Sequence, residues 1–121
     1  GGIGITPLMS IIRYVDQAHP DVRVTLIYSA PQPSELAFLD ELQEISARND
    51  HIQCVFTTTQ PHDTIWKGNL GRIDQALIKK HLPANEAIFY LCGPPQMLED
   101  LSESVTNLGV MQSNIRVEKW W

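Results

Sequence analysis

Apolar residues recur along the chain with two alternating periods, and this alternation predicts helices and strands in turn. After a glycine-rich start, the apolar positions 8, 11, 12 and 15 follow the helical period, which predicts a helix that ends before Pro20. Residues 22–29 (VRVTLIYS) are apolar and β-branched, as is typical of a buried strand. The chain therefore begins with a helix that leads into a strand.

The same alternation continues to the end of the sequence. Pro31 and Pro33 end the first strand, and we expect Ser34 to cap the next helix with Glu35 in its first turn. The remaining predicted elements are a strand at 51–58, a loop at 59–69, a helix at 74–80, a strand at 87–92, a helix that begins at 93–95 and ends at Gly109, and a strand at 114–118.

This order of elements predicts an α/β fold. Strands that alternate with helices over short connections are parallel and are joined by right-handed crossovers, so we expect an open, doubly wound, mostly parallel sheet with helices on both faces. Residues 1–121 are expected to form one domain. Ligands of such sheets bind at the carboxyl ends of the strands, where the loops at 1–7 and 92–97 lie.

Composition and charge exclude several classes of protein. Hydrophobic residues make up 43% of the chain and charged residues 19%, which excludes a disordered protein. The net charge of -5 and the lack of a basic run exclude nucleic-acid binding. No apolar run is long enough to cross a membrane, and the four histidines have no spacing that predicts a metal site. Two distant cysteines within apolar runs favour a reduced, cytoplasmic compartment.

The first loop, GGIGITP at residues 1–7, has the composition of a diphosphate-binding turn. Gly1, Gly2 and Gly4 let a backbone approach a diphosphate, Thr6 adds a hydroxyl, and the following helix supplies N–H donors. A plain tight turn explains the spacing equally well. Pro7 stands where the dinucleotide fingerprint of dehydrogenases has its third glycine, and no acidic residue ends the next strand. A P-loop is excluded because no GK[ST] follows.

Taken together, five segments resemble the nicotinamide-binding domain of the ferredoxin–NADP reductase superfamily. They occur in family order over nearly the whole chain, and the glycine loop with CGPP is the most specific combination. NADH–cytochrome reductases and the reductase components of bacterial oxygenases resemble the sequence most. The segments are GGIGITP (1–7), LIYSAPQPSELAFLDEL (26–42), WKGNLGRID (66–74), YLCGPPQM (90–97) and VEKWW (117–121).

The resemblance implies a function. A flavin, usually FAD, sits on a separate N-terminal β-barrel, NAD(P)H binds this domain, and hydride passes from nicotinamide C4 to flavin N5. Electrons then pass to a haem, an iron–sulfur centre or ferric iron. The residues that match cofactor-binding positions are Gly1, Gly2, Gly4, Thr6, Pro7, Ser29, Glu35, Gly93, Pro94 and Trp120, and Cys92 matches the cysteine beside nicotinamide C4. A buried strand-end thiol is the alternative for Cys92.

Two finer expectations follow from the same resemblance. NADH is preferred over NADPH, because the segment 57–60 carries no cation for a 2′-phosphate and Glu35 matches an acidic position of the NADH–cytochrome reductases. A surface acid in the first turn of a helix is the alternative for Glu35. Trp120 matches a terminal aromatic residue that shields the flavin in the oxygenase reductases, and a tail packed on its own domain is the alternative.

The sequence also departs from the family pattern. The family has a central strand directly before the glycine loop, and its barrel motif, Arg-x-Tyr-Ser/Thr, is absent. We therefore expect a domain excised from a longer flavoenzyme, which binds nicotinamide weakly and no FAD when alone. The absent strand predicts an apolar slot, with either a re-paired sheet or a homodimer that fills it.

Two other functions remain open at this point. A non-catalytic nucleotide-binding or regulatory module would carry the same phosphate-binding loop without hydride transfer. A flavodoxin-like electron carrier needs a phosphate loop rich in serine and threonine, and GGIGITP has too few hydroxyls for it.

Overall fold

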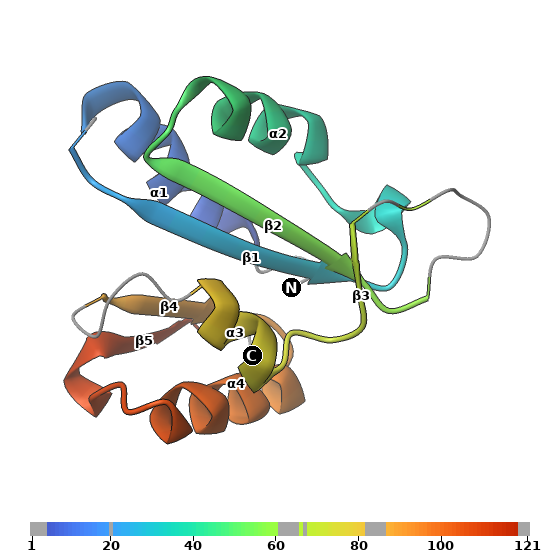
Figure 1. Ribbon diagram of the computed structural model, residues 1–121, viewed down its shortest axis with the longest axis vertical. Helices are drawn as coiled ribbons and strands as arrows, with labels where there is room; N and C mark the ends of the chain where they lie inside the picture. The colour runs from blue at the N-terminus through green and yellow to red at the C-terminus, as the bar shows by residue number, and fades with distance from the viewer. Residues whose placement is uncertain (1–4, 20, 61–65, 67, 82–86, 119–121) are drawn as a thin grey trace.

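The computed structural model describes residues 5–19, 21–60, 66, 68–81 and 87–118, in which helices and strands alternate as predicted (Figure 1). The elements are α1 (Ile5–Ala18), β1 (Val24–Ala30), α2 (Leu39–Arg48), β2 (Ile52–Thr58), β3 (Asn69–Leu70), α3 (Gln75–His81), β4 (Phe89–Cys92), α4 (Pro95–Asn107) and β5 (Ile115–Glu118), with short 3-10 helices at Pro33–Glu35 and Gln112–Asn114. The short strand β3 begins at the last residue of the segment 59–69, which the sequence predicts as a loop, and no strand is predicted there.

All the strand pairs are parallel, but the strands form two sheets. One has the order β1-β2-β3 and the other contains β4 and β5. No pairing joins β1 to β4 within the described parts of the chain. The sheet has therefore not re-paired across the place where the sequence predicts an absent central strand.

Helices cover both faces of this arrangement, which confirms the predicted fold class (Figure 1). Leu26, Tyr28 and Ala30 of β1 are buried in one core cluster together with residues of α1 and α2. Ile27, on the opposite face of the same strand, packs against a second cluster formed mainly by α3, β4 and α4. Because successive residues of a strand point to opposite faces, β1 carries apolar side chains toward both helical layers.

The start of α3 and both ends of α4 follow the predicted signals. The Asp74 carboxylate accepts a hydrogen bond of 2.8 Å from the Leu77 N–H and so caps α3. Pro95 occupies the first position of α4. At its other end, Gly109 has a φ of 91°, and the Val110 N–H donates to the Val105 carbonyl at 3.1 Å, which closes the helix.

The predicted cap at Ser34 is wrong. Ser34 lies inside a 3-10 helix, and α2 begins only at Leu39, after Phe38 with a φ of 62°. The backbone N–H of Gln32 donates to the Glu35 carboxylate at 2.9 Å, so Gln32 starts the turn instead. The Leu36 side chain is 4% exposed and packs into the core between this turn and the start of α2.

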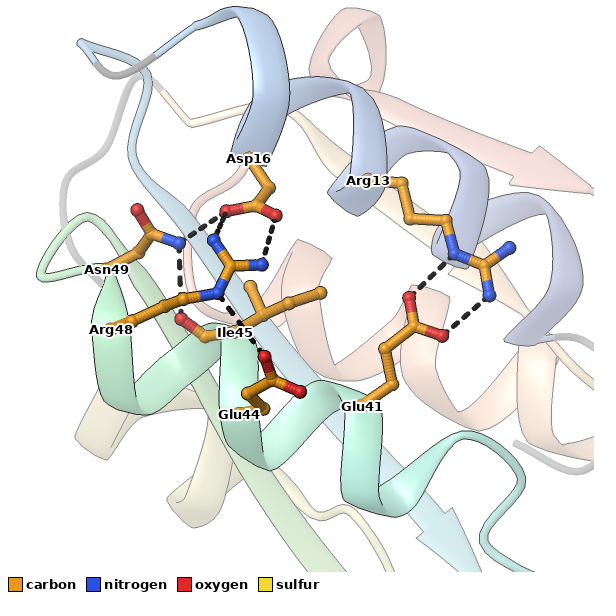
Figure 2. A network of polar contacts seen from close by, with 7 residues as sticks. All are labelled: Arg13, Asp16, Glu41, Glu44, Ile45, Arg48 and Asn49. Carbon is orange, nitrogen blue, oxygen red and sulfur yellow. Dashed lines mark hydrogen bonds and ion pairs between the residues drawn. The ribbon is translucent and has the colours of Figure 1, made fainter.

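Charged side chains tie α1 to α2 (Figure 2). Arg13 donates two hydrogen bonds to the Glu41 carboxylate, at 2.7 and 2.8 Å, and Arg48 donates two to Asp16 at the same lengths. The Asn49 amide also donates to Asp16. The Asp16 side chain is only 7% exposed, so we expect its ion pair to matter more than an ordinary surface pair.

The Asp16 ion pair predicts a dependence of stability on pH. The Arg48 guanidinium holds the pKa of Asp16 below its usual value. A carboxylate whose pKa is lowered by folding stabilises the fold above its unfolded-state pKa of about 3.9, and this contribution is lost as the pH falls through the folded-state pKa. In Asp16→Asn, the free energy of unfolding should be lower at pH 7 and should fall less steeply below pH ~4.

Urea titrations between pH 2.5 and 7 measure this difference. Glu44→Gln is the matched control, because the Glu44 side chain is 75% exposed and its oxygen lies 3.8 Å from Arg48 Nε. Equal acid dependence in Asp16→Asn and the unmodified chain would contradict the assigned role of Asp16.

Candidate functional site

The predicted phosphate-binding helix begins at the carboxyl edge of the sheet. Helix α1 ends where the chain turns into β1, so its N-terminus lies at the opposite edge, where β1 ends (Figure 1). Thr6 is exposed and Pro7 is partly buried, both in its first turn, which contains no acidic residue. Gly1, Gly2 and Gly4 lie outside the described residues. The helix end therefore offers N–H donors and the positive end of a helix dipole to an anion.

The second group of predicted residues follows the end of β1. Ser29 is partly buried and pairs in register with Thr57 of β2. Glu35 is exposed in the 3-10 helix beyond the strand, and its Oε2 accepts the hydrogen bond from Gln32. This hydrogen bond stabilises the local turn, so Glu35 also fits the alternative of a surface acid in the first turn of a helix. Its other oxygen, Oε1, makes no hydrogen bond to a described residue and can accept one from a ligand.

The third group follows the end of β4. Cys92 is the last residue of the strand and is 3% exposed, so its thiol is packed inside rather than displayed on an open surface. Gly93 is buried with a φ of 156°, a backbone conformation that is almost confined to glycine. Pro94 is exposed at the cap of α4. The turn thus combines a buried thiol, a conformation that needs glycine and a helix N-terminus.

Sequence reasoning passed over two hydroxyls at the end of β2. Thr57 and Thr58 are fully buried, and Thr57 Oγ1 donates to the Gly71 carbonyl at 2.6 Å. Thr58 Oγ1 has no hydrogen-bond partner among the described residues. The signal for these hydroxyls is a pair of threonines that directly follows the apolar run 54–56 at the end of the strand.

The remaining chemistry of the described residues is limited. Burial raises the pKa of the Cys54 thiol to about 11, so this cysteine is protonated near neutral pH and is a poor nucleophile. The described histidines, cysteines and carboxylates form no group suited to a metal ion. Among the described helices, none combines the length and apolar character that a membrane crossing requires.

Comparisons with known proteins identify the family of the chain. Residues 1–103 match the oxidoreductase NAD-binding domain family. The chain is 34% identical over 136 residues to the zebrafish (Danio rerio) oxidoreductase NAD-binding domain-containing protein 1, covering 100% of this chain and 50% of that protein. It is 30% identical over 117 residues to NADH-cytochrome b5 reductase 1 of Emericella nidulans, covering 90% of this chain and 37% of that protein.

A solved structure shows the same likeness as the sequence comparisons. Flavohemoglobin from Malassezia yamatoensis, solved with bound FAD and heme, superposes with a TM-score of 0.81 and 25% identity, and the match covers 97% of this chain and 29% of that one. The chain thus spans half or less of the length of these relatives. The family match confirms the resemblance drawn from the motifs. This chain belongs to the oxidoreductase NAD-binding domain family.

Proposed function

We propose that residues 1–121 form the nicotinamide-binding domain of a flavin-dependent oxidoreductase. The support for this proposal is that three predicted segments lie at the carboxyl edge of parallel strands. They are the start of α1 and the ends of β1 and β4. That edge is where dinucleotides bind in doubly wound folds. The match to the NAD-binding family supports the same cofactor.

Each segment has a part in holding the dinucleotide. The N-terminus of α1, with Thr6, Pro7 and the loop that contains Gly1, Gly2 and Gly4, binds the diphosphate. Ser29 and Glu35 face the adenosine ribose. Cys92, Gly93 and Pro94 position the nicotinamide, and the proposed role of Cys92 is placement, because hydride transfer needs no covalent intermediate.

The chemistry comes from two bound groups. NADH supplies a hydride from nicotinamide C4, and FAD on a separate N-terminal domain accepts it. The residues of this chain fix the distance and orientation of the nicotinamide and keep water away from it. We propose a haem, an iron–sulfur centre or ferric iron as the electron acceptor and the cytoplasm as the compartment. Flavohemoglobin, which was solved with FAD and heme, is a relative with such partners.

Binding of NADH to the chain tests this proposal. We expect millimolar NADH to shift the backbone amide resonances of Thr6, Ser29 and Gly93, which lie in the three segments. Met111 and Tyr14, which are 68% and 62% exposed, serve as controls at the opposite edge of the sheet. An absence of shifts at saturating NADH, or shifts confined to the controls, would overturn the proposed site.

We predict that Glu35 discriminates against NADPH. A carboxylate beside the ribose repels a 2′-phosphate, and an exposed charge contributes up to about 1 kcal/mol, or about five-fold. In the full-length protein, Glu35→Gln should raise kcat/KM for NADPH about five-fold and change that for NADH little. The glutamine retains an oxygen for the hydrogen bond from Gln32.

Glu103→Gln is the matched control, since Glu103 is an exposed acid on α4. If both variants change the NADPH kinetics equally, the effect belongs to net charge and not to a ribose contact.

We also propose that Trp120 shields the flavin in the full-length protein. Trp120 lies outside the described residues. A ring stacked on the flavin has to move before nicotinamide can arrive, so Trp120→Ala should speed flavin reduction or raise the rate of hydrogen peroxide formation. Stopped-flow absorbance and peroxide assays measure both rates. Unchanged rates, with an unchanged flavin spectrum, would contradict the shielding role.

A further inference from the structure

A buried tyrosine of β1 is hydrogen-bonded to the turn that carries Glu35. The Tyr28 side chain is 1% exposed, and the centroid of its ring lies 6.3 Å from that of Phe56 on β2. Its Oη accepts a hydrogen bond of 2.8 Å from the backbone N–H of Ala37. Ala37 lies two residues after Glu35, so the core of the protein is bonded directly to the segment that holds this acid.

Residues 32–38, which we call the acid turn, are held at three places. At the start, the Gln32 N–H donates to the Glu35 carboxylate at 2.9 Å. In the middle, the Leu36 side chain packs into the core and is 4% exposed. Near the end, the Tyr28 hydroxyl accepts its hydrogen bond. The first contact is internal to the turn, whereas the other two connect the turn to the core.

The acid turn ends on a backbone conformation that has to be held in place. Phe38 has a φ of 62°, which residues with a Cβ disfavour. A residue keeps such a conformation where its surroundings fix it. The Tyr28 hydroxyl binds the N–H of the preceding residue, Ala37, and the Arg13 guanidinium carbon lies 5.1 Å from the centroid of the Phe38 ring. Loss of the hydroxyl therefore removes one of the contacts that hold the turn and lets the turn relax.

The hydroxyl of Tyr28 can be removed without a change of charge or of ring. Burial raises the pKa of Tyr28 above its ordinary value of 10.0, so the group that accepts from Ala37 is a neutral phenol near neutral pH. Phenylalanine keeps the buried ring and lacks only the hydroxyl. A changed response of Tyr28→Phe to a charged ligand therefore comes from the position of the acid turn and not from a charge at residue 28.

We propose that Tyr28 is a positioning residue that determines the choice between NADH and NADPH by fixing the acid turn. The inference rests on the proposed function, in which Glu35 faces the adenosine ribose. Exposed charges interact weakly, and salt screens them further as their separation grows. Glu35 is exposed, so the place of its charge depends on the turn that carries it. Repulsion of a 2′-phosphate therefore requires that the turn be held near the ribose.

The same hydrogen bond fixes the second proposed ribose contact relative to the first. Ser29 follows Tyr28 directly in β1, and its backbone is held by the pairing with β2. The bond from Ala37 to Tyr28 ties the acid turn to this strand end. Ser29 and Glu35 are thereby kept at a fixed separation, which two side chains need in order to bind one ribose together.

Steady-state kinetics of the full-length protein test the proposal. The quantity measured is the selectivity ratio, which is kcat/KM for NADPH divided by kcat/KM for NADH. In Tyr28→Phe we expect this ratio to rise about five-fold, as in Glu35→Gln, because both variants remove the same repulsion by an exposed charge. The value of kcat for NADH should stay within about two-fold, since lost ribose binding raises KM and leaves the hydride step unchanged. Adding Glu35→Gln to Tyr28→Phe should change the ratio by less than about two-fold, because coupled residues are not additive.

Two control variants separate this role from a general loss of stability. Tyr14→Phe makes the same chemical change at a tyrosine of α1 that is 62% exposed. Val105→Ala truncates a residue of α4 that is 1% exposed in the other core cluster, which lowers the free energy of unfolding. Both controls should keep the selectivity ratio of the unmodified protein. Hydrogen exchange measured by mass spectrometry should be faster for the peptide that contains Ala37 in Tyr28→Phe and unchanged there in both controls.

The opposite results overturn the proposal. An unchanged selectivity ratio in Tyr28→Phe, an equal rise in Val105→Ala, or a rise that adds fully to that of Glu35→Gln each excludes positioning through Glu35. A full-length protein that oxidises neither nucleotide contradicts the proposed function, and the inference fails with it. A protein that oxidises NADH, with the same selectivity ratio in Tyr28→Phe as in the unmodified form, overturns the inference alone.

Discussion

Replacing Gly93 by alanine is expected to slow flavin reduction by NADH about 100-fold in the full-length protein, because a displacement of about 1 Å in a reacting group costs that much. Gly93 is buried between Cys92 and Pro94, with a φ of 156°. A Cβ disfavours that conformation by about 1–3 kcal/mol, so the turn shifts. The nicotinamide then loses its alignment with the flavin.

Gly109→Ala is the matched control at the other end of α4. Gly109 has a φ of 91°, and a Cβ there meets no atom within 4 Å. The substitution strains the backbone by about 1–2 kcal/mol but lies far along the chain from the β4 turn. It should lower the free energy of unfolding and leave the rate of flavin reduction unchanged. Anaerobic stopped-flow absorbance measures the rates, and equal slowing in both variants would contradict the role of Gly93.

Truncation of Leu42 should cause the largest loss of stability. Its side chain is 0% exposed in the core cluster that joins α1, α2, β1 and β2. Leu42→Ala should lower the free energy of unfolding by about 2–5 kcal/mol, because it removes apolar contacts and leaves a cavity. Urea denaturation followed by circular dichroism measures the change.

Two further variants keep the Leu42 prediction decisive. Leu70→Ala, at a leucine that is 70% exposed, should change stability by no more than about 0.5 kcal/mol. Leu42→Met keeps the side-chain volume and should cost less than about 1.5 kcal/mol. A loss below 1 kcal/mol for Leu42→Ala would show that the core is not organised around this residue.

The sequence allowed the order and type of the main elements to be predicted, because each has its own period and end signals. The last helix is the clearest case, with Pro95 at its start and Gly109 just past its end. The apolar runs predict β1 and β4 to start two residues before their observed first residues. The extra residues of these runs, which include Val22 and Ile88, lie outside the strand pairing and are exposed. The two-residue strand β3 is too short to have a period.

The local chemistry of the site was predictable, but its packing was not. The glycines, threonine and cysteine can be read directly from GGIGITP and CGPP. The apolar run that ends in Cys92 allows a buried strand-end thiol to be predicted, but the hydrogen bond from Thr57 to the Gly71 carbonyl joins residues distant in sequence, and no local pattern encodes it. Likewise, the cap at Ser34 failed because Gln32 and the buried Leu36 decide that turn.

The most direct test of the account is hydride transfer itself in the full-length protein. NADH, and NADH deuterated at the transferred position of nicotinamide C4, are mixed anaerobically with the oxidised protein, and flavin absorbance is followed. The account predicts that NADH bleaches the flavin, with a rate that rises and saturates with NADH concentration and is lower for the deuterated cofactor. A flavin that stays oxidised in saturating NADH would contradict it.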